Sequence, residues 1–410
     1  MWMDNVKGNV TASETMSLRE TEQKVNGNQW SSTERNTNNS WNLNNNGSWN
    51  NNNRNNNRGV RGVISVLSFS SAFTFEELYG AYLDCRKRKR STEEAIEFEM
   101  DENYNLWVLY NELLDGTYEV SESYVFVIDF PKPREVFAAR YRDRIVHHLF
   151  YNRVIKYIEK DLIDTTYSCR IGKGNLKAIQ DSYQAMMDYT SDGRDLYVFK
   201  GDIEGFFMNI DKNILYRLVI PYCKDEFTLW LLRKILFNDP TKNCIFRSSR
   251  KKWKLIDKNK TLFNSNGKGL PIGNLPSQMF ANVYMNVLGL YVLNKLHIPI
   301  FIYVDDFIIF CFDREILKQD IKWIEQFLMN KLGLRLHKGK RYLQHFTKGY
   351  RFVGGVVKPY RTYITNEIKY RFYNNLDDNS KFISYCGLMG HHKTYNIRKN
   401  IWHLILEMTK

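Results

Sequence analysis

Two adjacent aspartates, Asp305 and Asp306, stand between two runs of β-branched and aromatic residues, Phe301–Val304 and Phe307–Phe310. The apolar runs predict two strands, and the aspartates fall at the turn between them. Neighbouring carboxylates repel each other and gain nothing inside a core, so a positive group is expected against them. A divalent cation with oxygen ligands is the natural choice. The alternative is a solvated hairpin turn, because Asp is a common turn residue.

A third acidic residue, Asp202, ends the strand-like segment Leu196–Gly201 and is followed by the aromatic pair Phe206 and Phe207. A second strand beside the hairpin would bring Asp202 close to Asp305. Three carboxylates at neighbouring strand ends predict a two-metal site, which binds the attacking and leaving oxygens of a phosphoryl transfer.

The charge of the chain indicates a polyanionic partner. Its 410 residues carry a formal net charge of +14, and most of the basic excess lies after the first 65 residues. With 26 Tyr and 25 Phe, whose rings can stack on bases, this balance favours nucleic acid over simple solubility. The six cysteines form no C-x-x-C pair and no zinc-like spacing with His, which indicates buried thiols in a reducing compartment. The polar start predicts no signal peptide, and no apolar run reaches the roughly 18 residues of a membrane-spanning helix.

The elements that would position these acids follow from hydrophobic spacing and helix-end signals. Ser91 with Glu94 predicts a capping box at the start of a helix that runs to Leu113. Ser277 predicts the cap of the helix that leads into the Asp-Asp hairpin. The other predicted elements are helices over 75–90, 145–158 and 314–332, strands over 124–130 and 352–357, and a helical, basic C-terminal stretch.

The first half of residues 131–148 is dense in cations and suits phosphate contacts, and two further segments are basic, Cys169–Asn175 and Leu336–Arg341. The pair His147-His148 is expected to be structural or to contact RNA. It is a poor metal site, because adjacent helical residues point about 100° apart and no third ligand is evident. Cys169–Asn175 is Gly-rich but is neither a Walker A motif nor a dinucleotide fingerprint, and a plain surface turn is the alternative.

The leader, residues 1–65, has a composition unlike that of a folded domain, since 14 of the 22 residues from Asn36 to Asn57 are Asn. Such a segment cannot bury enough apolar surface to offset the entropy lost on ordering. The sequence therefore predicts a disordered Asn-rich leader.

From Phe69 to the C-terminus, the order of these segments resembles that of reverse transcriptases. Asp202 with its two Phe resembles the first palm motif, Tyr303-Val304-Asp305-Asp306 the catalytic hairpin, and Gly349–Gly354 the primer-grip strand. The resemblance implies an α+β fold with the right-hand polymerase architecture. Its parts would be fingers with the start of the palm over 66–195, a palm of antiparallel sheet and helices over 196–360, and a short helical thumb over 361–410.

Within that family the chain most resembles the reverse transcriptases of diversity-generating retroelements. The resemblance rests on Pro133–Glu135, Arg142–His148 and Ile272–Gln278, the last of which fits the pattern I/L-G-x-x-x-S-Q. Many other reverse transcriptases have Gln where Ile272 stands, and Arg140 departs from the Pro that is more frequent in this group. The implied function is copying of a template RNA into cDNA, with low fidelity at template adenines, for mutagenic retrohoming into a target gene.

The resemblance also implies roles for single residues. Asp202, Asp305 and Asp306 would be catalytic, and together with Ile203 they would hold two Mg²⁺ ions. The residues that would contact the incoming nucleotide are Arg134, Arg170, Phe207, Ile272, Gly273 and Lys338, with Lys132 and Lys340 as further candidates. Phe207, in preference to Phe206, would exclude ribonucleotides by crowding the 2′ position, and core packing is the alternative for both.

The resemblance also implies that two positions set fidelity, Ile272 and Gln278. An apolar residue at 272 cannot hydrogen-bond near the nascent base pair, and apolar contacts discriminate weakly. The resemblance therefore implies loose selection opposite template adenine.

The same resemblance interprets the leader and the partners. Residues 30–63 resemble the variable segment of the retroelement's target proteins, which predicts a template repeat translated in frame with the enzyme. The expected partners are template RNA, a cDNA or DNA primer, dNTPs and an accessory variability protein, in the cytoplasm and encoded by a bacterium or phage. The alternatives are a retron-like or group II intron-like reverse transcriptase, and a non-catalytic RNA-binding protein on the same scaffold.

Overall fold

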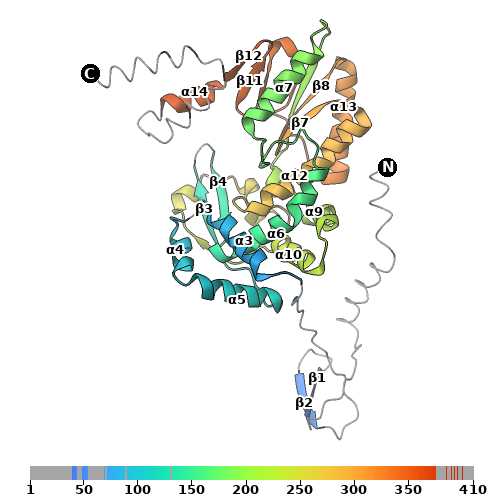
Figure 1. Cartoon of the computed structure of the whole chain (residues 1–410). Helices are drawn as coiled ribbons and strands as arrows, with labels where there is room; N and C mark the ends of the chain where they lie inside the picture. The colour runs from blue at the N-terminus through green and yellow to red at the C-terminus, as the bar shows by residue number, and fades with distance from the viewer. Residues whose placement is uncertain are drawn as a thin grey trace, which may run out of the picture. The chain divides into compact units, whose positions relative to one another are not determined.

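The computed structural model describes residues 39–43, 49–53 and 69–374, except for 70–71, 88–89 and 130–131 within the last range. It also describes the single positions 385, 389, 392, 395 and 399. The chain divides into two compact units, Met1–Ser68 and Phe69–Lys410 (Figure 1). Within the described residues, no helix is both long and apolar enough to span a membrane.

The first unit contains one described element, the antiparallel hairpin of β1 (Asn39–Leu43) and β2 (Trp49–Asn53). The composition predicts no regular structure here, and these ten residues differ from that expectation. A strand ladder is made by backbone groups, which an Asn-rich sequence supplies as well as any other. The rest of the predicted leader, and most of residues 30–63, lie outside the described residues.

A helical layer makes up much of the second unit (Figure 1). Its longest helix, α6 (Tyr141–Asp161), contacts α3, α10 and α12. It buries Ile145, Leu149 and Ile158 on one face, which confirms the predicted helical spacing. The other helices of this layer are α3 (Phe75–Arg86), α4 (Glu93–Met100), α5 (Glu102–Leu114), α9 (Lys212–Val219), α10 (Glu226–Phe237) and α12 (Leu275–Tyr291).

A small sheet with strand order β4-β3-β6 lies in the same part of the second unit. Strand β3 (Ser123–Ile128) pairs antiparallel with β4 (Arg134–Ala138) and parallel with β6 (Cys244–Phe246). This hairpin carries Arg134 at the first position of β4.

The central sheet has strand order β7-β8-β5-β9, and every neighbouring pair is antiparallel. Its strands are β5 (Tyr197–Asp202), β7 (Ile300–Tyr303), β8 (Asp306–Cys311) and β9 (Tyr342–His345). Helices α7 (Asn175–Tyr189) and α13 (Arg314–Phe327) flank β7 and β8 on opposite sides (Figure 1).

Both faces of this sheet are buried at β7 and β8, so these two strands are nearly continuous apolar runs. On β8, Ile308 and Phe310 belong to the core cluster that includes Ile179 of α7. Phe307 and Ile309 belong to the cluster that includes Leu317 of α13. The alternation follows from the pleat, which sends successive side chains to opposite faces.

The segment predicted as a single strand over 352–357 is instead a hairpin. Strand β10 (Tyr350–Phe352) pairs with β11 (Gly355–Lys358) across a two-residue turn at Val353 and Gly354. Both turn residues have positive φ, 48° and 84°, which is the type I′ conformation that matches strand twist. The prediction missed it because a Gly-Gly pair inside an apolar run is also compatible with a continuous strand.

Strand β12 (Arg361–Ile364) extends this sheet into the region predicted as a short helical thumb. Helix α14 (Asn366–Tyr373) follows, and most of the remaining predicted thumb lies outside the described residues.

Two predicted helix caps are wrong. Helix α4 begins after Thr92, which makes no side-chain capping bond, so Ser91 and Glu94 do not form a capping box. A box does cap α3, through Thr74 and Glu77. Helix α12 begins after Asn274, while the Ser277 hydroxyl donates to the Pro271 carbonyl at 2.7 Å.

The remaining elements are single helical turns. They are α8 (Phe206–Asn209), α11 (Arg250–Trp253), η1 (Ile220–Tyr222), η2 (Lys258–Lys260), η3 (Leu262–Asn264), η4 (Val292–Leu296), η5 (Leu328–Leu332) and η6 (Phe346–Lys348).

Candidate active site

Three carboxylates meet at one end of the central sheet. Asp202, the last residue of β5, is the cross-strand partner of Asp306, the first residue of β8. Asp305 lies in the turn between β7 and β8, and its carbonyl accepts a hydrogen bond from the Ile203 N–H at 3.1 Å. Residues far apart in the sequence are thus brought together by strand pairing.

The turn that carries Asp305 has an unusual backbone. Tyr303 pairs with Asp306, which leaves Val304 and Asp305 as the two turn residues. Val304 has φ 57°, and Asp305 is not among the residues with positive φ, a combination typical of a type II′ turn. Glycine is the usual residue at that first position, and a β-branched side chain there costs on the order of 1–3 kcal/mol. Strain of this kind clusters at functional sites.

Close packing of β5 against β8 depends on Gly201. It is the cross-strand partner of Phe307, and a Cβ added to Gly201 would lie 2.3 Å from Cζ of that ring. The glycine therefore lets the phenyl ring cross β5 directly beside Asp202.

Two lysines compensate two of the carboxylates. The Lys340 ammonium lies 2.9 and 3.2 Å from the two carboxylate oxygens of Asp202. The Lys200 ammonium lies 2.8 Å from Oδ1 of Asp306, an ion pair without hydrogen-bond geometry at that oxygen. The loop that carries Lys340 is fixed to β5, because the His337 N–H donates to the Asp202 carbonyl at 2.7 Å.

Burial and mutual repulsion act on the acids. Burial raises the pKa of Asp305, and the charge of Asp202 raises it further, while Lys340 and Arg134 lower it. Burial raises the pKa of Asp306 to about 6, against the opposing effect of Lys200. The site thus holds more negative charge than its lysines neutralise, which favours binding of a cation.

The donor set suits Mg²⁺, which takes a small number of carboxylates and completes its shell with phosphate and water oxygens. Among the described residues, however, no three His, Cys, Asp or Glu side chains are already arranged as a metal cluster. In the structure, Asp202 and Asp306 are oriented toward their lysines. A metal would therefore compete with both ammonium groups for these oxygens.

The other predicted cations differ in their surroundings. Arg134 and Lys132 are exposed, and Arg134 is close enough to Asp305 to lower its pKa. Lys338 is exposed on the loop, whereas Lys340 makes the contact with Asp202.

Arg170 is engaged within the protein. Its guanidinium pairs with Glu159 at 2.7 Å and donates to the carbonyls of Ile163 and Thr166, each at 2.9 Å. Only 8% of its side chain is exposed. Binding of a nucleotide by Arg170 would require these bonds to break.

The two phenylalanines that follow Asp202 differ in burial. Phe206 is buried in the main core, whereas Phe207 is half-buried. Phe207 also packs against the apolar cluster of Val125, Phe137, Met208 and Leu262. Of the two rings, Phe207 is the accessible one.

Ile272 packs against the same cluster as Phe207. The Ile272 carbonyl accepts a hydrogen bond from the Phe137 N–H at 2.9 Å, which joins this loop to β4. Gly273 has φ 117°, and a Cβ there would lie 2.7 Å from Cγ1 of Val136, so a side chain is excluded. Gln278 is exposed on the first turn of α12 and lines a small cavity with Cys169.

Among the residues that the structure describes, the histidine pair of α6 belongs to no group of three His, Cys, Asp or Glu side chains that could hold a metal. Burial lowers the pKa of His147 to about 3, and its Nδ1 has no hydrogen-bond partner. Burial also lowers the pKa of His148. Both imidazoles are therefore neutral at pH 7, as expected for structural residues.

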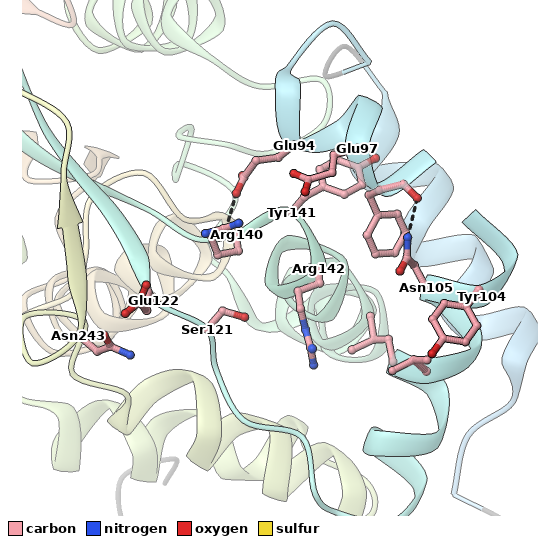
Figure 2. Close-up of a pocket in the computed structure, with 13 residues that line it drawn as sticks. Glu94, Glu97, Tyr104, Asn105, Ser121, Glu122, Arg140, Tyr141, Arg142 and Asn243 are labelled. Carbon is pink, nitrogen blue, oxygen red and sulfur yellow. Dashed lines mark hydrogen bonds and ion pairs between the residues drawn. The ribbon is translucent and has the colours of Figure 1, made fainter. Parts of the chain in front are cut away.

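A cavity lies elsewhere in the second unit. It has a volume of about 630 Å³ and lies between α4, α5 and the start of α6, with Glu94 and Glu97 on one side and Arg140 and Arg142 beside them (Figure 2). The Glu94–Arg140 ion pair crosses its edge. None of the three aspartates lines it.

Sequence reasoning missed Lys200 altogether. The signal was present, because Lys200 precedes Asp202 by two positions on a strand and therefore shares its face. A lysine inside an apolar strand is itself a sign of a buried partner.

Among solved structures, the chain is similar to the apo telomerase of Candida tropicalis truncated from its C-terminal domain, with 12% identity, TM-score 0.43, and coverage of 60% of this chain and 55% of that one. It is also similar to Candida albicans telomerase in complex with the TWJ fragment of telomeric RNA, with 11% identity, TM-score 0.42, and coverage of 60% and 46%. The chain thus spans about half the length of these structures. No curated protein matches the sequence.

A family profile gives the assignment. The profile described as "Reverse transcriptase (RNA-dependent DNA polymerase)" matches residues 134–370, which include both aspartate-bearing strands and the β10–β11 hairpin. This match covers more than half of the chain. The chain therefore belongs to the reverse transcriptase family of RNA-dependent DNA polymerases.

Proposed function

We propose that this chain copies a template RNA into cDNA as an RNA-directed DNA polymerase. The observation that carries the proposal is the cross-strand pairing of Asp202 with Asp306, with Asp305 in the adjoining turn. The reaction is attack of a primer 3′-hydroxyl on the α-phosphate of a dNTP, with release of pyrophosphate.

The three carboxylates of Asp202, Asp305 and Asp306 would hold two Mg²⁺ ions, with the Ile203 backbone beside them. When bound, these ions supply positive charge for the attacking hydroxyl and the leaving phosphate oxygens. Arg134, exposed and near Asp305, would bind the triphosphate, and Lys132 and Lys338, which are also exposed, are further candidates for this role. Phe207 would exclude the 2′-hydroxyl of a ribonucleotide.

We further propose that the enzyme serves a diversity-generating retroelement. Ile272 supports this subtype, because its apolar side chain stands beside Phe207 in one cluster and offers no hydrogen bond to a nascent base pair. Gly273 fixes the loop against β4. Gln278, exposed on the next turn, would contribute to the same selection. The result would be misincorporation opposite template adenine and mutagenic retrohoming of the cDNA.

The proposed partners are template RNA, a cDNA or DNA primer, dNTPs and an accessory variability protein. The net charge of +14 supports the nucleic-acid partners. The proposed setting is bacterial cytoplasm, from a bacterial or phage gene. The proposed parts are fingers over 66–195, palm over 196–360 and thumb over 361–410.

The leader would be a template repeat over residues 30–63 that is translated in frame with the enzyme. Sequencing of the flanking DNA tests this directly. A near-copy of this segment in a neighbouring gene, differing mainly at adenines, is expected. A locus without such a copy would refute the retroelement assignment of the leader.

A primer-extension assay tests the polymerase function. The full chain is incubated with an RNA template, a DNA primer, dNTPs and Mg²⁺, and the Asp305→Ala variant is compared with wild type. Glu315→Ala, an exposed acid on α13, is the matched control. Extension by wild type and by the control, with none by Asp305→Ala, is the expected result, and equal extension by all three would overturn the proposal.

A further inference from the structure

A lysine inside the central sheet touches one of the three aspartates. Lys200 lies on β5, two positions before Asp202, and its ammonium is 2.8 Å from Oδ1 of Asp306. Only 14% of the Lys200 side chain and 22% of the Asp306 side chain are exposed. No palm motif identified in the sequence includes Lys200.

The sheet register explains how the lysine reaches this acid. Lys200 is the cross-strand partner of Ile308 on β8, while Asp202 is the partner of Asp306. Lys200 and Asp306 are therefore diagonal neighbours on the same face, a separation that a long side chain spans. The ammonium thus lies at the catalytic end of the sheet although its backbone lies one step inside it.

Lys200 also lies next to a contact between β9 and the β10–β11 hairpin. Its partner on β9 is Tyr342, and the Tyr342 hydroxyl accepts a hydrogen bond from the Arg351 N–H of β10 at 2.8 Å. Lys200 therefore stands between the Asp-Asp hairpin and the β10–β11 hairpin. The Lys200 backbone pairs with β8 on one side and with β9 on the other.

The second lysine of the site is different. Lys340 contacts Asp202 from a loop, and 45% of its side chain is exposed. Solvent and salt screen an exposed pair and weaken it. An enclosed pair is screened much less, so removing one of its partners leaves a charge without compensation.

We propose that Lys200 is the resident counter-ion of Asp306, holding this carboxylate in place while no metal is bound and weakening metal binding there by its own charge. Lys200 is thus a positioning residue, which acts through the Asp306 carboxylate. The inference rests on the proposed function, because the competing cation is the Mg²⁺ of the polymerase reaction.

Two consequences follow when Lys200 is replaced by Met, which keeps the length of the side chain and removes its charge. Without the ammonium, Asp306 faces Asp202 and Asp305 with less compensation, so the metal-free chain becomes less stable. A divalent cation then binds with less repulsion, and its half-saturating concentration falls by about tenfold. A purely structural lysine would cause the first effect without the second.

The experiment is a thermal unfolding titration of the full chain without nucleic acid. Unfolding midpoints are measured in EDTA and over a series of Mg²⁺ concentrations for wild type, Lys200→Met, Lys200→Arg and Lys318→Met. Lys318 forms a 2.7 Å pair with Glu315 on the exposed surface of α13 and controls for loss of any lysine pair. The expected result is a lower midpoint in EDTA and tighter Mg²⁺ binding for Lys200→Met only, with both restored in Lys200→Arg.

A Lys200→Met chain with the wild-type Mg²⁺ half-saturation, or a weaker one, overturns the inference. If that variant is too unstable to measure, Asp306→Asn is added, because removing both partners of a buried pair is far less costly than removing one. The double variant must regain the wild-type midpoint in EDTA, and failure to do so also overturns the inference.

Failure of the polymerase proposal and failure of the Lys200 inference give different experimental results. A wild-type chain that neither responds to Mg²⁺ nor extends a primer refutes the polymerase proposal and this inference together. A wild-type chain that does both, with an unchanged Lys200→Met response, refutes only the role of Lys200.

Discussion

Asp202 and Asp306 are cross-strand partners in the central sheet, yet each carboxylate is oriented toward a different lysine. The backbone pairing fixes where the acids stand. The lysines decide how much of their charge remains for a cation. In the proposed function, metal ions would take the place of these ammonium groups.

The first prediction concerns Asp202→Asn. Loss of one carboxylate from the proposed metal site should lower primer extension by about a thousandfold or more. The same change relieves repulsion of Asp305, so the thermal midpoint without metal should not fall. Single-turnover extension and thermal unfolding measure the two effects.

The control is Asp195→Asn, an acid just before the same strand, which pairs with His345 and is 71% exposed. It should keep wild-type extension. Extension by Asp202→Asn at the wild-type rate would contradict the assignment of the site.

Much of this site could be predicted from sequence. Alternating and continuous apolar runs predicted β5, β7 and β8, and the acids at their ends predicted the site. Strand order is not encoded locally, so no pattern within one segment specifies the register that pairs Asp202 with Asp306. The internal bonds of Arg170 were also out of reach, because its partners include backbone carbonyls, which no side-chain pattern reveals.

The errors have a common physical cause. The caps of α4 and α12 and the turn at Val353 and Gly354 were misplaced because several residues nearby could satisfy the same local rule. Tertiary packing chose among them. The types of β5, β7, β8 and α6 were predicted correctly, whereas helix ends and the breaks within the predicted segments 91–113 and 352–357 were not.

The second prediction concerns pH. Burial raises the pKa of Asp306 from 3.8 to about 6, so the folded chain binds this proton more tightly than the unfolded chain does. Its contribution to the free energy of unfolding is therefore greatest below about pH 4 and is lost as the pH rises to about 6. Asp306→Asn removes this dependence. Without metal, the free energy of unfolding of Asp306→Asn should therefore rise relative to that of wild type between about pH 4 and about pH 6.

Addition of Mg²⁺ provides the check on this pH effect. A bound cation favours the charged carboxylate, so the difference should shrink when Mg²⁺ is present. A difference that is constant with pH would show that Asp306 does not titrate in this range.

The third prediction concerns the glycine beside the site. Gly201→Ala places a Cβ 2.3 Å from the Phe307 ring, which must move and carry the neighbouring Asp306 with it. The free energy of unfolding should fall by about 1–3 kcal/mol, the usual cost of overpacking a core. Primer extension should fall as well. Denaturant unfolding and single-turnover extension measure both.

Gly80→Ala is the matched control, because Gly80 lies within α3 and an added Cβ there meets nothing within 4 Å. It should raise the free energy of unfolding by roughly 0.5–1 kcal/mol, since Ala favours helix over Gly. If both variants behaved alike, close packing at Gly201 would not be the cause.

The fourth prediction concerns fidelity. Ile272 packs in one cluster with Phe207 and Phe137 and presents no hydrogen-bonding group to a base pair. Ile272→Gln supplies an amide at this point, and discrimination based on hydrogen bonds greatly exceeds that based on apolar shape. Misincorporation opposite template adenine should fall by about tenfold or more, with smaller changes opposite other bases. Sequencing of primer-extension products on an RNA template of balanced composition gives the error spectrum.

Ile272→Val controls for altered packing, because it removes one methylene and keeps the site apolar. It should retain the wild-type preference for errors at adenine even if total extension falls. The distinction matters because both variants disturb the same cluster, but only Gln adds a donor and an acceptor. An unchanged error spectrum in Ile272→Gln, with extension intact, would separate Ile272 from fidelity and leave it a packing residue.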